Sequence, residues 1–386
     1  MARTIDDLKR YPLPALVVGL VGAVAAVAGG IANLPWLLHA YLTAYFFWLS
    51  LALGCLAVLL LQNLTGGYWG AVMRRFLEAG AGTLPLLAAL FLPVIAGLRV
   101  LYPWVDPQSY AGIALPAFKQ AYLSVPFWIG RAVVYFAIWI VLGQTAIHWS
   151  KARDANPDPA FTRRLRNLAA PGLVLVGLTV TFAAFDWLMS LEPAWASSIY
   201  GAMVSMGALL TGFALAIALT TWLAEREPLA GLVSPEALNR MGSLLLAFLM
   251  LWAYLAFSQF LLIYAGNLPA EAIWYVRRIT GRWLAVGLVV VVFHFILPFC
   301  VLIMRDLKRK RPVLGATALL LVAADYVNLY WLIRPAFAGP GFTWLDAVLP
   351  IAIGGMWLAG FTWLLGRTPL VARYDPQLIQ GMEGTS

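Results

Sequence analysis

Long apolar runs, separated by short polar stretches, follow one another along the whole chain. A helix of about 20 consecutive apolar residues is long enough to cross the hydrocarbon core of a bilayer. The pattern therefore predicts an all-α polytopic membrane protein with ten transmembrane helices and no separate extramembrane domain in residues 1–386. The ten predicted helices lie at residues 13–32, 36–61, 82–101, 125–148, 170–190, 196–223, 241–265, 283–304, 313–334 and 343–365.

The positive charges predict the orientation of these helices. When the N-terminus is placed inside, most of the 26 Lys and Arg residues fall in the inner connections and at the two termini. Basic residues accumulate on the cytoplasmic side of membrane proteins, so both termini are expected there. The segment Trp69–Gly80 (WGAVMRRFLEAG) is amphipathic and is expected to lie on the inner membrane surface.

Two halves of the chain resemble each other in the order of their polar and small residues. We interpret them as two parallel four-helix bundles, the first at 36–190 and the second at 196–334, with the first and last helices outside them. Small residues in helical stripes allow close packing in lipid, and Gly54 and Gly212 are in register in two such stripes. The other matching pairs are Ala96-Gly97 with Ala265-Gly266, Gly130-Arg131 with Gly281-Arg282, and Asp186-Trp187 with Asp325-Tyr326.

Composition supports the membrane class and excludes several others. The chain is 62% hydrophobic and 11% charged, and its 17 Trp, 15 Tyr and 20 Phe residues suit interfacial aromatic belts. The net charge of +9 does not indicate nucleic acid, because the basic residues lie in short loops. Two cysteines in apolar runs give no metal-binding spacing. Three histidines, His39, His148 and His294, are too few for two bis-histidine haems.

The stretch FDWLMSLEPAW, residues 185–195, joins two apolar runs and carries two acids. Asp186 lies about one turn inside the first run, where an acid costs roughly 2.5–3.5 kcal/mol on insertion scales. An acid in this position is either a functional group or a cap that fixes the helix end. Glu192 follows in the connection, at the outer side.

Further polar residues are expected near the bilayer midplane. Asp325 and His294 lie at similar depths in neighbouring helices and can exchange a proton, and Asn328 follows Asp325 on the same helical face. Tyr254 and Ser258 form an i, i+4 polar pair in the helix 241–265. The expected proton pathway combines these side chains with Asp186 and Glu192, and the proton would leave near Glu192. A proton relay and a hydrogen-bonded lock between helices are equally consistent with the pattern of Asp325 and His294.

Arginines near the outer helix ends have two possible roles. Arg131 and Arg282 either extend to the membrane interface or turn inward to pair with Asp186 and Asp325. Arg334 is expected at the outer surface, facing a partner.

Two stretches, KQAYLSVPFWIGR (119–131) and DWLMSLEPAWASSIYG (186–201), resemble signatures of the ActF-type membrane subunits of bacterial alternative complex III, within the wider NrfD/PsrC-like family. The resemblance extends over nearly the whole chain. In that family His-Trp-Tyr is expected after the Glu-Pro pair, whereas this chain has Ala194-Trp195-Ala196. No histidine role is therefore transferred to that turn.

The resemblance implies a subunit of a quinol:acceptor oxidoreductase in the bacterial inner membrane. It implies a part in proton movement, no redox centre in this chain, and a possible menaquinone or other quinone ligand. The implied partners are a paralogous membrane subunit, periplasmic iron–sulfur and haem c subunits, and membrane lipids. A secondary transporter and a purely scaffolding membrane subunit are the alternatives, since parallel repeats with midplane polar residues also occur in transporters.

Overall fold

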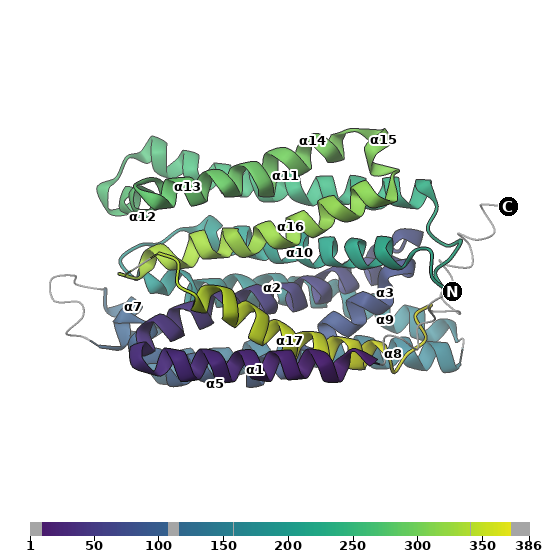
Figure 1. The fold of residues 1–386 in the computed structure, drawn as a ribbon, viewed down its shortest axis with the longest axis horizontal. Coiled ribbons are helices and arrows are strands. Elements are labelled where there is room, and N and C mark those ends of the chain that lie inside the picture. Colours follow the sequence, from purple (N-terminus) through teal and green to yellow (C-terminus); the bar gives the residue numbers. More distant parts are fainter. Residues whose placement is uncertain (1–9, 107–115, 157, 340, 372–386) are drawn as a thin grey trace.

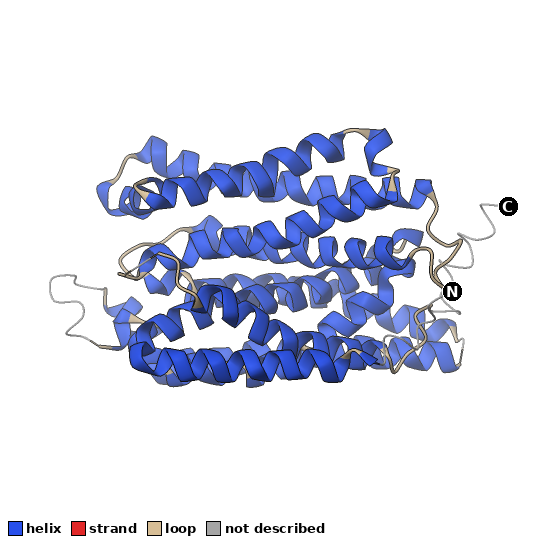
Figure 2. Ribbon diagram, in the orientation of Figure 1, coloured by secondary structure: helices blue, strands red, loops and turns tan. Residues whose placement is uncertain are grey.

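The computed structural model describes residues 10–106, 116–156, 158–339 and 341–371. Within these ranges every regular element is a helix (Figure 2), which confirms the predicted all-α class. The long helices lie side by side along one axis, and most connections lie at the two ends of the molecule (Figure 1). Nine helical stretches in the described part of the chain are long and apolar enough to cross a membrane. This is the architecture of a multi-pass membrane protein.

The long helices follow the predicted apolar runs closely. The predicted ranges 13–32 and 36–61 fall within one helical stretch, Pro12–Thr65, whose two α-helices are joined by a 3-10 turn at Ile31–Asn33. The major helices are α1 (Pro12–Gly30), α2 (Leu34–Thr65), α8 (Val125–Ala155), α9 (Pro159–Trp187), α10 (Ser198–Leu223), α11 (Pro235–Gly266), α16 (Arg311–Ile333) and α17 (Leu345–Leu365). The stretch Arg282–Ile303 consists of α13 (Arg282–Val289), a π-helical segment (Val290–Ile296) and α14 (Leu297–Ile303). The short helices are α7 (Ala117–Tyr122), α12 (Pro269–Ile279) and α15 (Arg305–Lys308).

Local sequence explains where several of these helices begin. The side chains of Asn33, Asp158 and Ser234 accept hydrogen bonds from backbone N–H groups in the first turns of α2, α9 and α11. In each of these helices a proline occupies one of the first two positions, where the loss of its N–H leaves no internal hydrogen bond unmade. At the other end of α11, Asn267 adopts the left-handed conformation that often ends a helix.

The segment Trp69–Gly80 does not lie on a membrane surface, so that prediction is wrong. It belongs to α3 (Tyr68–Gly82), which begins a helical stretch that continues through α4 (Leu84–Ala89), α5 (Leu92–Ala96) and α6 (Leu98–Leu101). All residues of α3 from Gly70 to Gly82 are buried. The polar face of α3 is buried because its charges find partners inside the protein.

These partners form one cluster at one end of the helices. Glu78 accepts hydrogen bonds from Arg74 Nε at 3.0 Å and from Arg75 Nη1 at 2.5 Å. Arg75 also forms an ion pair with Asp154, and Arg74 donates to the Ser150 hydroxyl at 3.1 Å, both on α8. Buried charges are tolerated when they are paired and hydrogen-bonded. The charged face of α3 is paired in this way inside the protein, so its amphipathic pattern does not indicate a position at the membrane surface.

Helix α2 is the central helix, and it packs against α10 without any side chain between the two backbones. A Cβ atom added at Gly54 of α2 would lie 1.9 Å from the carbonyl oxygen of Ala208 in α10. One added at Gly212 would lie 2.4 Å from the carbonyl carbon of Gly54. Only glycine fits at this crossing. The two stripes of small residues found in the sequence therefore face each other here.

Helices α1 and α17 form a second close contact at the edge of the molecule. Cβ atoms added at Gly19 and Gly355 would lie 2.6 and 2.5 Å from backbone nitrogens of the opposite helix. The contacts pair the N-terminal part of α1 with the C-terminal part of α17, so the two helices are antiparallel (Figure 1). The first and last long helices thus pack on each other.

We expect Gly54→Ala to lower the free energy of unfolding in detergent by about 1–3 kcal/mol, the usual cost of forcing an extra group into a packed core. Thermal denaturation followed by circular dichroism measures the change. Gly177→Ala on α9 is the control, because a Cβ there meets no atom within 4 Å. Equal stability of both variants would show that the α2–α10 contact tolerates separation.

Candidate functional site

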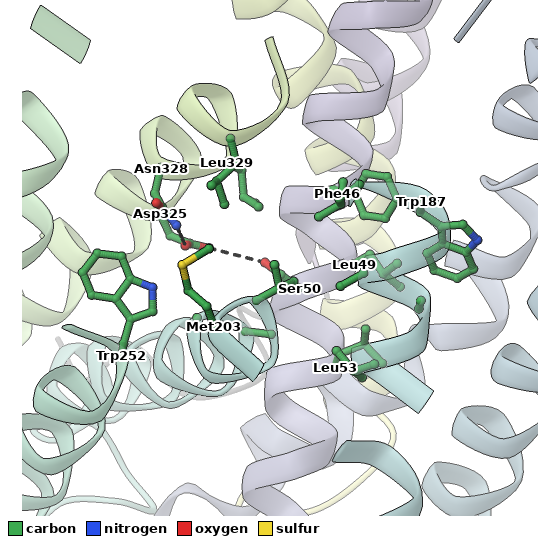
Figure 3. A pocket seen from close by; sticks show the side chains of 18 residues that line it. Phe46, Leu49, Ser50, Leu53, Trp187, Met203, Trp252, Asp325, Asn328 and Leu329 are labelled. Carbon is green, nitrogen blue, oxygen red and sulfur yellow. Dashed lines mark hydrogen bonds between the residues drawn. The ribbon is translucent and has the colours of Figure 1, made fainter. Parts of the chain in front are cut away.

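The middle of the helical bundle contains a small buried group of polar side chains. Asp325, on α16, is 2% exposed, and its carboxylate faces α2 and α10. It accepts a hydrogen bond from Ser50 of α2 at 3.5 Å, drawn as a dashed line in Figure 3, and one from Asn328 at 3.3 Å, and the Thr211 hydroxyl of α10 is a third donor. The bonds from Ser50 and Asn328 are long for charge-assisted contacts, and all three donors are neutral. The carboxylate is therefore held in place but not saturated with donors.

His294 is the second ionisable member of this group. Its side chain is fully buried, and its Nε2 lies 4.0 Å from the Oδ1 of Asp325, which confirms the predicted proximity of the two residues. This separation is too long for a hydrogen bond. Neither ring nitrogen of His294 has a hydrogen-bond partner within the described part of the chain. The Trp252 ring contacts the imidazole edge-on, with 4.2 Å between the ring centroids.

The backbone around His294 is itself unusual. Residues Val290–Ile296 form a π-helix rather than an α-helix, and Pro298 follows two residues later. A π-helical insertion rotates the side chains after it relative to those before it, and such insertions frequently occur at functional sites. Here the insertion places an imidazole against the core from a helix whose other residues are largely exposed.

A cavity of about 40 Å³ lies beside Asp325. Ser50, Asp325 and Asn328 form its polar wall, and Phe46, Leu49, Leu53 and Trp187 lie on the opposite side (Figure 3). A buried water needs roughly 10–15 Å³ of such space and two or more polar partners. The cavity has room for water next to the carboxylate.

Asp186 occupies a different environment from Asp325. Arg131 of α8 binds it through both arms, with Nε–Oδ2 and Nη2–Oδ1 distances of 2.7 and 2.8 Å. The Tyr135 hydroxyl donates to Oδ2 at 2.8 Å, and Asp186 is 0% exposed. Of the two alternatives for Arg131, extension to the interface or pairing with Asp186, the structure shows the pairing. With three donors in place, this carboxylate joins α8 to α9.

The backbone at Asp186 is fixed as well. The Trp128 indole donates to the Asp186 carbonyl at 2.8 Å, and the Ser190 hydroxyl donates to the same oxygen. Tyr102 donates to the carbonyl of Trp187 at 3.0 Å. Arg131 lies over the Tyr122 ring, 3.8 Å from its centroid. This dense network favours the structural role for Asp186 over the relay role.

Glu192 is not at the free outer surface, contrary to the expectation from sequence. Its side chain is 9% exposed and is bound by two arginines of α12, Arg277 at 2.8 Å and Arg278 at 2.7 Å. Burial lowers the pKa of the Arg278 guanidinium, and the nearby Glu192 opposes this shift. Glu192 therefore connects the turn after α9 to α12.

Arg334 is also buried rather than facing a partner. It is 4% exposed and bonds to Asp346, with 3.3 Å between Nη2 and Oδ2, and to the Gly341 carbonyl. Asp346 also accepts from the backbone N–H and the hydroxyl of Thr343, both at 2.7 Å. Sequence reasoning missed Asp346. The spacing Thr343-x-x-Asp346 before an apolar run is the capping pattern that would have indicated it.

The remaining predicted residues do not join the buried group. Arg282 donates to the carbonyl of Gly339 at 2.7 Å instead of pairing with Asp325. Tyr254 is 65% exposed and lies on the outward face of α11, with half-buried Ser258 one turn along the helix. An i, i+4 spacing places two residues on one face but does not say which face points to the core.

Within the described ranges, no group of three or more His, Cys, Asp or Glu side chains is arranged to hold a metal ion. No protein-family model matches this chain, and no curated protein is significantly similar to it in sequence.

We expect Arg131→Gln to lower the free energy of unfolding by about 3–5 kcal/mol, because it leaves the buried Asp186 carboxylate without its partner. The double variant Arg131→Gln/Asp186→Asn should recover part of this loss. Chemical denaturation in detergent measures both. Losses that simply add in the double variant would mean that the two side chains do not interact.

Proposed function

We propose that this chain is an integral membrane subunit of a quinol:acceptor oxidoreductase of the alternative complex III type, in which Asp325 and His294 carry protons through the bilayer midplane. The observation that supports this most is the buried pair itself. An acid and an imidazole lie 4.0 Å apart inside an apolar bundle, and the imidazole nitrogens have no partner within the described chain. Ionisable groups at this depth usually mark ion or proton paths.

The geometry around Asp325 suits proton transfer better than a hydrogen-bonded lock between helices. A lock between helices is stabilised by short, saturated hydrogen bonds, as at Asp186, whereas the Asp325 contacts are 3.3 and 3.5 Å. A small approach of the π-helical segment to α16 would bring the His294 Nε2 within hydrogen-bond distance of the Asp325 carboxyl. A proton can then pass from the carboxylic acid to the neutral imidazole.

The proposed pathway is narrower than the one expected from sequence. It retains Asp325 and His294, adds Ser50 and Asn328 as hydrogen-bonding neighbours, and leaves Asp186 and Glu192 as structural ion pairs. The redox steps belong to partner subunits that carry iron–sulfur and haem centres. The exposed apolar faces of the outer helices are the surfaces on which a second membrane subunit and lipids would pack.

Two other functions are distinguishable from this one. A scaffolding subunit would need the polar centre only for stability. A secondary transporter would bind a solute at the bundle centre, and the cavity of about 40 Å³ beside Asp325 is too small for a solute much larger than water. The long hydrogen bonds of Asp325 favour proton movement over scaffolding, and the size of the cavity that touches Asp325 favours it over solute transport at this acid.

We expect Asp325→Asn to reduce proton release per electron in the assembled, reconstituted complex, because the amide keeps the shape and hydrogen bonds of the carboxyl but cannot ionise. The same loss is expected for His294→Gln. Vesicles with an entrapped pH-sensitive dye measure the ratio during quinol oxidation. Asp306→Asn, on the short helix α15, removes an acid outside the spanning segments and serves as the control.

A structural role would give a different result. In that case Asp325→Asn would leave the proton ratio unchanged, and only Asp325→Leu would reduce the amount of assembled complex. Unchanged proton ratios in both Asp325→Asn and His294→Gln would overturn the proposed function.

A further inference from the structure

Asp325 differs from the other buried acids of the described chain because no arginine or lysine lies beside it. Each of the others forms an ion pair with at least one arginine, namely Asp186 with Arg131, Asp346 with Arg334, and Glu78 and Glu192 with two arginines each. Among the described residues, the one ionisable side chain within ion-pair distance of Asp325 is His294, at 4.0 Å. A buried carboxylate needs a counter-charge. At Asp325 this charge has to come from a proton or from a bound cation.

The two hydroxyl groups beside Asp325 can act as cation ligands as well as hydrogen-bond donors. A hydroxyl carries a single hydrogen and two lone pairs. The Ser50 hydroxyl has the Phe47 carbonyl as an acceptor at 2.8 Å, nearer than Asp325 at 3.5 Å. The Thr211 hydroxyl, which also neighbours Asp325, donates to the Gly207 carbonyl at 2.8 Å. When both hydrogens point to these backbone carbonyls, lone pairs from α2 and α10 face the carboxylate.

The spacing of the polar atoms suits an ion of the size of Na⁺. Na⁺ has nearly the radius of Ca²⁺, whose oxygen ligands lie about 2.3–2.6 Å from the ion, so two ligands at right angles are about 3.3–3.7 Å apart. The Ser50 oxygen lies 3.5 Å from the Asp325 carboxylate, and the Asn328 amide nitrogen lies 3.3 Å from it. A half turn of the Asn328 amide puts its oxygen in that place. K⁺ is larger, and the close contact of α2 with α10 opposes the separation that K⁺ would need.

The charge and the size of the site favour a small monovalent ion. Among the described residues around the site, Asp325 supplies the single negative charge, and its oxygen-bearing neighbours are neutral. A divalent ion would leave a positive charge uncompensated inside an apolar bundle. The cavity of about 40 Å³ beside Ser50, Asp325 and Asn328 has room for the ion with water as a further ligand (Figure 3). An organic cation is too large for this space.

A second and much larger cavity connects this site with one end of the bundle. Its volume is about 750 Å³, and it lies between α11, α12, α13, the π-helical segment and α16. Four residues line both cavities, namely Met203, Trp252, Asn328 and Leu332. The wall of the large cavity is mainly apolar, but Gln259 also lines it and contacts Ser197 at the start of α10. These polar side chains mark a route for an ion from the end of α10 to Asn328 and Asp325.

We propose that Asp325, Ser50, Thr211 and Asn328 form a binding site for Na⁺ in the middle of the bundle. One carboxylate with neutral oxygens is a ligand set for hard cations, whereas transition metals favour sites with imidazole or thiolate ligands. The site does not depend on the proposed function. Its consequence for that function is competition, because a carboxylate that holds Na⁺ does not accept a proton.

The test measures binding of radioactive Na⁺ to the purified full-length chain in phosphatidylcholine nanodiscs, with choline chloride keeping the ionic strength constant. We expect saturable binding that unlabelled NaCl displaces at least about tenfold more effectively than KCl. Asp325→Asn should abolish binding, because the amide carries no charge. NaCl should also raise the midpoint of thermal unfolding of the unmodified chain above that in KCl, since a ligand that binds the folded state stabilises it.

Thr211 and Thr220 of α10 provide a matched pair of variants. Both residues are 0% exposed, and both hydroxyls donate to the carbonyl four residues earlier, at 2.8 and 2.7 Å. Thr211→Val removes a proposed ligand with little change of volume and should weaken Na⁺ binding about tenfold or more. Thr220→Val removes the same group at a position distant from Asp325 and should bind Na⁺ as the unmodified chain does. Circular dichroism verifies that both variants are folded.

Three results would contradict this inference. They are no saturable Na⁺ binding by the unmodified chain, an equal effect of Thr211→Val and Thr220→Val, or displacement of Na⁺ by KCl as readily as by NaCl. The proton ratio of the assembled complex tests the proposed function separately. Na⁺ binding together with an unchanged ratio in Asp325→Asn would retain the site and remove the proposed function. Absence of Na⁺ binding together with a lowered ratio would do the reverse.

Discussion

The contact of α2 with α10 through Gly54 and Gly212 is the constraint on which the rest of the structure depends. In lipid, helices gain little from the hydrophobic effect when they associate, so close backbone approach supplies much of the packing energy. This contact fixes the distance between α2 and α16, both of which pack against α10. Ser50 and Asp325 can share a hydrogen bond only at that distance. The position of the site therefore depends on Gly54 and Gly212, which lie about one helical turn away from it and allow the two backbones to approach.

The two buried acids, Asp186 and Asp325, differ in their surroundings, and this difference distinguishes a structural acid from a reactive one where the residue type does not. Asp186 and Asp325 are both almost fully buried, yet one has a bidentate arginine and a tyrosine as partners and the other has only neutral donors, Ser50, Thr211 and Asn328, among the described residues. A saturated buried pair resists change, since removal of either partner leaves an uncompensated charge. An unsaturated acid beside a small cavity and an unpartnered imidazole can change its protonation state with smaller rearrangement. The contacts of the first acid are those of a structural ion pair, and the second is the acid for which we propose proton transfer.

The apolar pattern predicted the helices well because about 20 apolar residues in a row have few alternatives to crossing a membrane. It also predicted that His294 lies near Asp325, and it left pairing with Asp186 as one of two alternatives for Arg131, since both contacts follow from depth and neighbouring helices. It failed for α3, for Glu192 and for Arg334, whose charges are neutralised inside the protein by partners on other helices or connections, and in α3 also within the helix itself. The cavity of about 750 Å³ between α11, α12, α13 and α16 lay beyond sequence reasoning for a related reason. Its wall combines side chains from five helices and a π-helical turn, and no linear spacing encodes that arrangement.

The Asp186–Arg131 pair has a consequence for how the protein enters the membrane. Arg131 lies near the start of α8 and Asp186 near the end of α9, so the charge on α8 is synthesised 55 residues before its partner. An unpaired arginine inside a bilayer is unfavourable. If α8 and α9 enter the bilayer together, Arg131 and Asp186 enter as an ion pair with no net charge. Insertion of α8 and α9 as one hairpin avoids the exposed intermediate. The ion pair would then act during biogenesis, because α8 would be stable in the lipid only after α9 has inserted beside it.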